Sequence, residues 1–130
     1  MRTFTPDEAN VLLDELRPRV ELLVEHKRRL DEAEEARRDL QERIGSNGGD
    51  ITRSDIVEIT ERVEREATAI GDIVEEIQGH GVQIKDLEVG LLDFPWQRGS
   101  EVVLLCWRLG EDEIGYWHGM DEGYAGRKPL

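Results

Sequence analysis

The chain has one cysteine, three histidines and few aromatic residues, which make up 5% of its 130 residues. A single cysteine, Cys106, cannot form an internal disulfide bond, and this agrees with a reducing, cytoplasmic location. No apolar run approaches the roughly 18 residues of a membrane-spanning helix, and residues 1–20 lack a basic segment followed by an apolar one. We therefore expect a soluble, cytoplasmic protein that is not exported.

Short catalytic motifs are also missing. The chain has no Gly-x-x-x-x-Gly-Lys phosphate loop, no His-Glu-x-x-His, Cys-x-x-Cys or Gly-x-Ser-x-Gly motif, and no Glu-x-x-His pair of the di-iron bundles. Their absence excludes most enzyme classes that a short motif identifies. It leaves open whether the protein is an enzyme.

Basic residues are too few and too dispersed to attract a polyanion. The chain has 17 Lys and Arg against 30 Asp and Glu, a formal net charge of -13, and its basic residues are mixed with acidic ones. Phosphate backbones and anionic lipid surfaces would be repelled by such a surface. We expect neither a nucleic-acid nor a membrane partner.

Helical patterns dominate the first part of the chain. Thr5–Glu8 carries an N-cap, a proline at the first helical position and a capping-box glutamate, so a helix should begin at about residue 6. Apolar residues then recur at spacings of three and four up to about residue 44, before a turn at GSNGGD. We expect a kink or break at Pro18, because proline removes a backbone hydrogen bond inside a helix.

A second helix is predicted from about Ser54 to Gln78, where the GHG sequence ends it. Its apolar residues include a series seven apart, a heptad pattern: Ile56, Val63, Ile70 and Ile77. The two helices are of nearly equal length beyond Pro18, which predicts an antiparallel helical hairpin over residues 6–78. We place this hairpin within a single domain, residues 1–130.

A two-helix hairpin has only one apolar seam, and further apolar side chains remain outside it: Leu12, Leu22, Val24 and Ile73. A second hairpin from another subunit could cover them in a four-helix arrangement. We therefore expect a homodimer formed through the helices, with the remaining region free to bind a protein partner.

Residues 82–130 have the pattern of short β-strands. We predict a strand near residues 82–87 and a β-hairpin that pairs residues 101–109 with residues 113–118, followed by a C-terminal loop. The predicted fold class is α+β: a long antiparallel helical hairpin with a small C-terminal antiparallel β-sheet.

Cys106 and His118 lie close together in the sequence, but the predicted hairpin separates them. If its loop is the four residues Gly110–Glu113, Leu105 faces His118, and alternation points Cys106 to the opposite side of the sheet. The two could not then share a metal ion, unless a one-residue bulge reversed the alternation. Cys106 is then best interpreted as a small core residue.

His118 ends the last predicted strand and is followed closely by Asp121 and Glu122. An imidazole that meets carboxylates is a suitable site for a divalent metal ion, and Asp93 could supply a further oxygen. The alternative is that His118 donates a hydrogen bond to a carboxylate or backbone carbonyl and pins the C-terminal loop. No cofactor is certain from the sequence; a divalent metal ion at His118, Asp121 and Asp93 is the candidate.

Two arginines in the same region are candidates for binding. Arg108 lies beside Trp107 in a predicted strand, and Arg127 lies in the C-terminal tail. An arginine among acidic residues is usually an ion-pair partner, and anion binding is the alternative. Together with Glu111, these are the candidate binding residues.

The stretches FTPDEANVLLDEL, GVQIKDLEVGLLDFP and LLCWRLGEDEIGYWHGMDEGYAGRKPL resemble a short bacterial and archaeal family known only as a domain of unknown function. The resemblance brings no activity with it. It implies that the family pattern concentrates in the β-region, on Lys85, Asp86, Gly90, Asp93, Phe94, Pro95, Cys106, Trp107, Gly110, Glu111, Trp117, His118, Asp121, Gly123, Gly126 and Arg127.

Two hypotheses for function remain. The first is a dimeric interaction or scaffold protein with a helical platform and a binding surface in the β-region. The second is a metal-dependent or anion-binding enzyme or sensor centred on His118 and nearby carboxylates.

Overall fold

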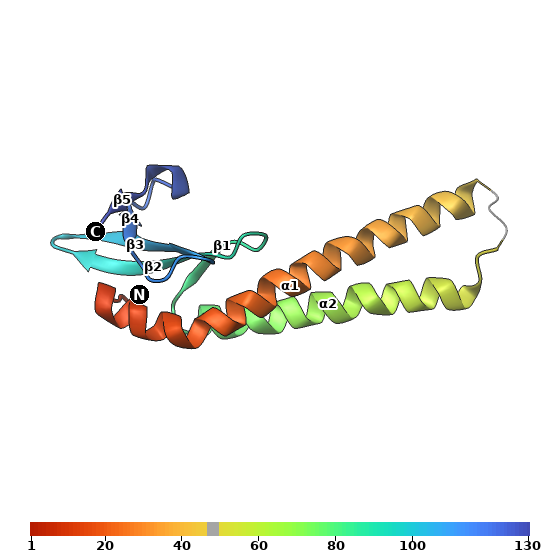
Figure 1. Ribbon diagram of the computed structural model, residues 1–130, viewed down its shortest axis with the longest axis horizontal. Helices are drawn as coiled ribbons and strands as arrows, with labels where there is room; N and C mark the ends of the chain where they lie inside the picture. Colours follow the sequence, from red (N-terminus) through yellow and green to blue (C-terminus); the bar gives the residue numbers. More distant parts are fainter. Residues whose placement is uncertain (47–49) are drawn as a thin grey trace.

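The computed structural model describes residues 1–46 and 50–130, which form two long helices followed by a five-stranded antiparallel sheet (Figure 1). The strands lie in the sheet in sequence order, so no connection crosses over. This confirms the α+β class. Residues 47–49 of the predicted GSNGGD turn lie outside the described residues. The elements are α1 (Pro6–Gly45), α2 (Arg53–Gly79), β1 (Gln83–Asp86), β2 (Leu91–Arg98), β3 (Glu101–Arg108), β4 (Tyr116–His118), the short 3₁₀ helix η1 (Tyr124–Gly126) and β5 (Lys128–Pro129).

Both long helices begin with a capping box. The Thr5 hydroxyl accepts a hydrogen bond from the Glu8 N–H, and the Glu8 carboxylate accepts one from the Thr5 N–H. Thr52 and Asp55 make the same reciprocal pair at the start of α2. These bonds satisfy backbone N–H groups that have no partner within the helix, which fixes where each helix begins.

Pro18 does not break α1, which runs without interruption from Pro6 to Gly45. The ribbon changes direction in its red-to-orange part, so the helix bends there (Figure 1). Leu16, Val20 and Leu23, on either side of the proline, are each at most 1% exposed. Burial of these side chains offsets the roughly 3 kcal/mol that an internal proline costs a helix.

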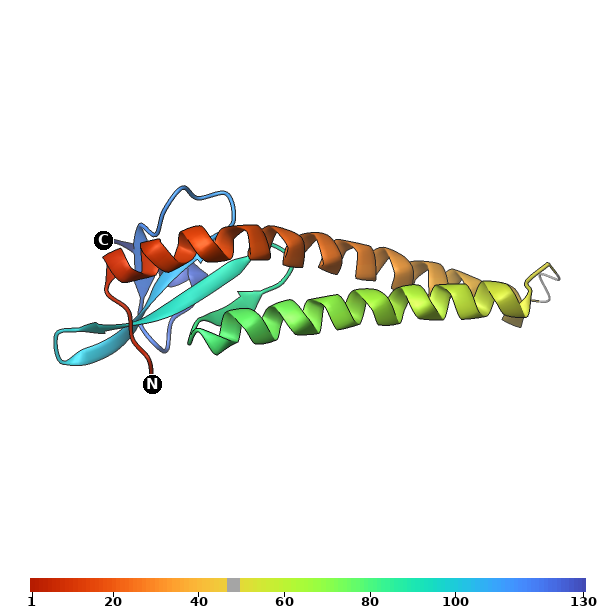
Figure 2. The same ribbon diagram turned by 90° about the horizontal axis from the view of Figure 1, so that it is seen from below.

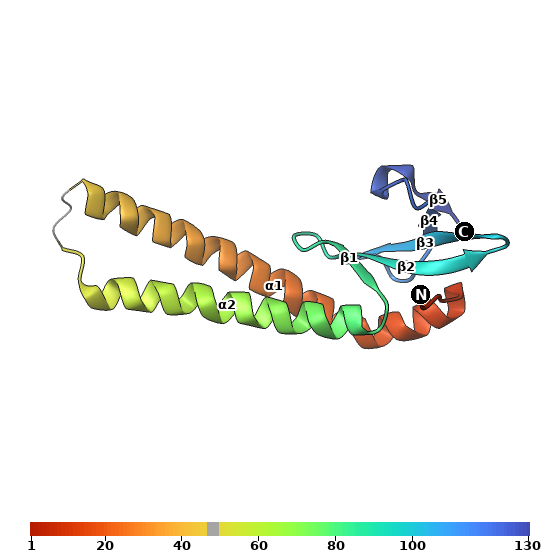
Figure 3. The same ribbon diagram turned by 180° about the vertical axis from the view of Figure 1, so that it is seen from behind.

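The first part of α1 packs across one face of the sheet (Figure 2). That face presents the buried side chains Leu92, Phe94, Leu105 and Trp107 to the helix. Beyond the sheet the two helices run on together and diverge toward their far ends, away from both chain ends (Figure 3). None of the helices in the described residues has the length and apolar character needed to cross a membrane.

The sheet covers part of the apolar surface that the sequence assigns to a second subunit. Leu12 and Ile73 are 9% and 7% exposed, and both belong to the core that joins the helices to the sheet. Leu22 is 44% exposed. The apolar surface left for a second copy is therefore smaller than the sequence predicts.

Strand β2 has no counterpart in the sequence prediction, which places no strand between residues 87 and 101. It pairs with β3 along its whole length, from Leu91 opposite Arg108 to Arg98 opposite Glu101. Pro95 is tolerated because β1 pairs only as far as Gln83 opposite Asp93, so the missing N–H meets no neighbouring strand. The Pro95 carbonyl accepts a hydrogen bond from the Phe4 N–H, at 2.7 Å.

Candidate metal centre

Three central strands bring Asp93, Cys106 and His118 together on the face of the sheet that points away from α1. Asp93 in β2 lies directly opposite Cys106 in β3. His118 in β4 lies opposite Leu104, and because alternate residues share a face, Cys106 is on the same side as Leu104. The expectation that Cys106 and His118 point to opposite faces is therefore wrong.

The connection between β3 and β4 explains the shifted register. It spans residues 109–115, longer than the predicted loop. The Trp107 indole N–H donates to the Glu111 carbonyl at 3.0 Å, and the Arg108 N–H donates to the Glu111 carboxylate at 2.7 Å. The Ile114 N–H donates to the Asn10 side chain of α1 at 2.8 Å. These bonds hold the loop away from the hairpin ladder, so pairing resumes only at Tyr116.

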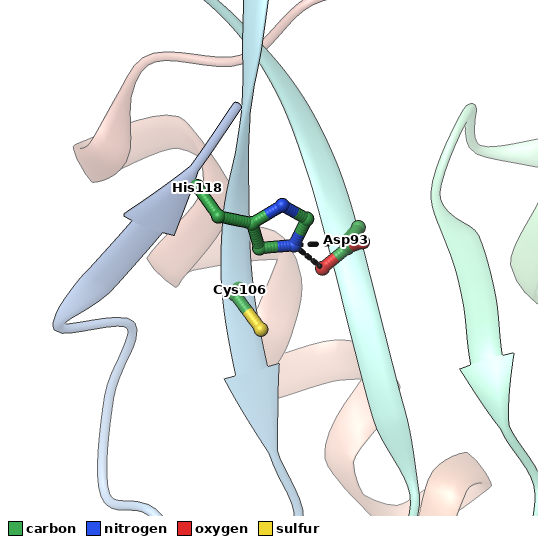
Figure 4. A group of neighbouring side chains, drawn as sticks. All are labelled: Asp93, Cys106 and His118. Atoms are coloured by element: carbon green, nitrogen blue, oxygen red, sulfur yellow. Dashed lines mark hydrogen bonds and ion pairs between the residues drawn. The ribbon is translucent and has the colours of Figure 1, made fainter. Parts of the chain in front are cut away.

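The three side chains form a closely spaced, buried cluster (Figure 4). One potential ligand atom from each lies within 4.8 Å of the other two. Asp93, Cys106 and His118 are 1%, 0% and 2% exposed, respectively. Within residues 1–46 and 50–130 this is the group of histidine, cysteine and carboxylate side chains that has the spacing of a metal site.

Both ring nitrogens of His118 face hydrogen-bond acceptors. Nδ1 donates to the Gly119 carbonyl at 2.9 Å, so it carries a hydrogen. Nε2 lies 3.1 Å from each oxygen of the Asp93 carboxyl group (Figure 4). Because Nδ1 is occupied by the Gly119 carbonyl, Nε2 is the ring nitrogen that faces Asp93 and the one that would bind a metal ion.

Cys106 completes the cluster as a protonated thiol. Burial raises its pKa to about 12, and the negative charge of Asp93 and a hydrogen bond to the same carboxylate add to the effect. At neutral pH the free thiol is therefore neither a thiolate nucleophile nor a redox-reactive group. A bound metal ion would change this, because a coordinating thiol loses its proton.

An ion pair of Arg127 with Glu111 lies beside the cluster. Arg127 Nη2 is 2.6 Å from a Glu111 oxygen, and the Arg127 side chain is only 8% exposed. Its guanidinium carbon lies 3.9 Å from the centre of the Tyr116 ring, and Tyr116 is the residue directly opposite Cys106. Arg127 and Glu111 are thus within electrostatic reach of Cys106.

The remaining candidates lie outside the cluster. Asp121 is exposed in the segment after β4 and is not among the three clustered ligands. Glu122 instead accepts hydrogen bonds from the Gly119 N–H and from Lys128, and so shapes this segment. The Arg108 side chain is exposed and lies near Tyr124. The structure therefore joins Asp93 to His118, as the sequence predicts, and adds Cys106 where the sequence places Asp121.

The cluster fits a zinc-type ion. Thiolate sulfur, imidazole nitrogen and carboxylate oxygen are the ligands that Zn²⁺ uses in proteins, and bonds of about 2.0–2.3 Å place tetrahedral donors roughly 3.3–3.8 Å apart. The donor atoms lie within 4.8 Å of one another, so metal binding would draw them together by about 1–1.5 Å at most. The bond from Nδ1 to the Gly119 carbonyl holds the ring in the orientation of a metal-ligating histidine, with Nε2 directed at the site.

The fold and the cluster together define a small α+β protein with a buried Asp–Cys–His site on the outer face of its sheet. The chain belongs to the family of uncharacterized conserved proteins DUF2203, whose model matches residues 2–130. No curated protein and no solved structure matches the chain.

Proposed function

We propose that the protein binds one zinc-type divalent metal ion through Asp93, Cys106 and His118. The observation that carries this proposal is the convergence of three different ligand types from three neighbouring strands, with their donor atoms within 4.8 Å of one another. A purely structural role would pair His118 with Asp93 and use Cys106 as a small core residue, so metal binding is what distinguishes the proposal.

Three protein ligands leave one position of a tetrahedral site open. Catalytic zinc sites have this composition, whereas structural zinc sites usually fill all four positions with protein ligands. At such a position the metal acts as a Lewis acid on a bound ligand or lowers the pKa of a bound water molecule. The proposal therefore favours a metal-dependent enzyme or sensor over a purely structural zinc site.

Cobalt substitution tests the proposal directly. Protein purified without an affinity tag is loaded with Co²⁺, and a near-ultraviolet thiolate-to-cobalt absorption band is expected. Cys106 is the sole cysteine of the chain, so this band reports on Cys106 alone. Cys106→Ser should abolish the band, and His118→Ala should weaken cobalt binding strongly.

His26→Ala is the matched control for His118→Ala. His26 is a half-buried histidine that pairs with Glu66 at 2.6 Å, but it lies between the long helices, outside the cluster. The His26→Ala variant should therefore leave the cobalt spectrum unchanged. If the wild-type protein gives no thiolate band and contains no stoichiometric metal, the proposal is wrong.

A second proposal concerns the far end of the helical hairpin. We propose that a second copy of the chain docks there, because a groove is lined by Leu40 and Ile59, and the exposed residues Ile44 and Ile56 directly follow two of its other lining residues in the sequence. The groove rim carries residues of both charges, so a copy related by a two-fold axis can pair acid with base: Asp39, Arg43, Asp55, Glu58 and Arg62.

Sedimentation velocity tests this dimer. A dimer at micromolar concentration is expected for the wild-type chain, and Ile56→Glu should shift it to monomer without changing the cobalt spectrum. A wild-type monomer at these concentrations would contradict the proposal.

A further inference from the structure

Arg127 is held in an unusual environment for a charged side chain. Its guanidinium group lies between two aromatic rings, with its central carbon 3.9 Å from the Tyr116 ring centre and 4.6 Å from that of Tyr124. One edge is paired with Glu111 at 2.6 Å. These contacts fix the plane of the group and leave only its other N–H bonds available for a further partner.

The Nε atom of Arg127 has no hydrogen-bond partner among the residues that the structure describes, although it is fully shielded from solvent. A buried charged donor without an acceptor is costly, and each such group in a folded protein needs an explanation. An acceptor that belongs to a ligand would satisfy it. Because the side chain as a whole is 8% exposed, the missing acceptor would have to be small.

The position of Arg127 links this unused donor to the metal site. Tyr116, on which the guanidinium stacks, pairs with Cys106 across β3 and β4, so the two side chains project from the same face. Arg127 therefore lies over the same face of the sheet as the cluster, on the residue that pairs with Cys106.

The balance of charges at the site also bears on whether an anion can bind there. A divalent ion would be balanced by the Cys106 thiolate and the Asp93 carboxylate, and Arg127 is balanced by Glu111, which is itself 28% exposed to solvent. The charge of Glu111 is therefore partly screened by water, whereas that of Arg127 is not. The site as a whole is then neutral, so a small anion is favoured by its proximity to the metal and to the guanidinium group of Arg127.

We infer that Arg127 anchors a small oxyanion at the open position of the proposed metal centre, with one oxygen on the metal and a second accepting the hydrogen bond of Nε. The inference rests on the proposed metal binding. The ligand class is an anion that offers two oxygen atoms, such as a small carboxylate or inorganic phosphate. Extended polyanions do not fit, because the donor is enclosed by Tyr116 and Tyr124.

Anion titration of the cobalt-loaded protein tests this inference. Acetate and inorganic phosphate are added separately at constant ionic strength, with chloride as the balancing salt, and the visible cobalt bands are followed. Saturable spectral changes are expected with acetate, with phosphate or with both, and the two titrations show which class is preferred. Chloride is a single atom, so it cannot contact the metal and Arg127 through two different oxygen atoms. It should therefore compete poorly for the anion site.

Two variants assign the second contact to Arg127. Arg127→Lys keeps the charge but removes Nε, so it should weaken oxyanion binding roughly tenfold or more while the thiolate-to-cobalt band remains. Glu111→Gln should act in the opposite direction and tighten binding, because Arg127 loses its counter-charge. Arg98→Lys is the control, since Arg98 stacks on Trp117 at 4.3 Å on the other side of the sheet.

The outcomes separate this inference from the metal proposal. If cobalt binds but neither oxyanion alters its spectrum, the anion site is refuted and the metal centre stands. If cobalt does not bind, both fall. If Arg127→Lys cannot hold cobalt, the Glu111→Gln titration decides, and unchanged or weaker oxyanion binding in that variant would overturn the role of Arg127.

Discussion

Zinc binding should release the proton of the Cys106 thiol at neutral pH. Burial raises the pKa of this thiol to about 12, so the thiol is protonated before the metal binds. Coordination by the sulfur displaces this proton, because a metal ligand must present a free lone pair.

The magnitude follows from this count. Each released proton makes the apparent affinity for zinc rise about tenfold per pH unit, so the Cys106 proton gives about a tenfold rise per unit. The sign is fixed, since protons compete with the metal: affinity increases with pH while the Cys106 thiol remains protonated in the metal-free protein. A surface site of already ionised carboxylates would show almost no such dependence near neutral pH.

Titration calorimetry measures the proton count. Zinc is titrated at pH 7 in buffers with different enthalpies of ionisation, and the slope of the observed heat against the buffer enthalpy gives the protons released. Cys106→Ser should lower the count by one, because a serine hydroxyl keeps its proton. Release of fewer than one proton by the wild-type protein would refute the proposed protonation of the cluster.

Three further predictions concern the metal-free protein. In the native state Cys106 should fail to react with a thiol reagent at pH 8, well below its pKa of about 12, and should react fully once the protein is unfolded; rapid reaction of the native protein would contradict its burial. Asp93→Val or His118→Leu alone should each cost about 3–5 kcal/mol, because either leaves its buried partner unpaired. For a chain of 130 residues, a loss of this size lowers the melting temperature by roughly 10–20 °C. In chemical denaturation the double variant, Asp93→Val with His118→Leu, should lose less free energy of unfolding than either single variant. Additive losses would count against the pairing. Gly90→Ala should destabilise the fold by about 2 kcal/mol or more, because Gly90 has φ +72° and an added Cβ would lie 2.9 Å from both Val20 and Leu109. Gly99→Ala, at φ +64° with open space around it, is its control and should cost only about 1–2 kcal/mol in the same thermal melts.

The helices are the part of the fold that the sequence predicts well, because their signals are local. Predicted bounds of about residues 6–44 and Ser54–Gln78 compare with Pro6–Gly45 and Arg53–Gly79 in the structure. Capping residues and apolar spacing act within one or two turns of the same segment. Pro18 is the exception, because the burial that keeps α1 continuous there comes partly from the sheet.

The β-region was harder to predict because its pairing depends on distant residues. Pro95 weakens the strand pattern of β2 in the sequence, but the Phe4 N–H, more than 90 residues away, uses the carbonyl of Pro95. The register of β4 depends likewise on Asn10 in α1, which holds the preceding loop at Ile114. Neither contact has a local sequence signal.

The candidate site was predicted in part. The sequence names His118 from its residue type and its place at a strand end, and Asp93 as a further oxygen ligand; the structure brings the two together. Cys106 was set aside because the side of the sheet on which a residue lies depends on whether the loop has an odd or even number of residues. Gly115, directly before Tyr116, was the available signal that β4 begins later than predicted, since glycine disfavours a strand interior.

The two faces of the sheet follow different physical rules, and this difference argues for a function of the cluster. The face against α1 is apolar and supplies the core with Leu92, Phe94, Leu105 and Trp107. The other face buries Asp93 and His118 in the middle of the sheet, where apolar residues of similar size would stabilise the fold at least as well. Folding alone therefore does not account for these residues. The Arg127–Glu111 pair is a second example. It buries the charge of Arg127 over the same face, although an apolar side chain would cover that face without the desolvation cost of a charge. The proposed role of this face, in holding a metal ion and its ligand, would explain both departures together.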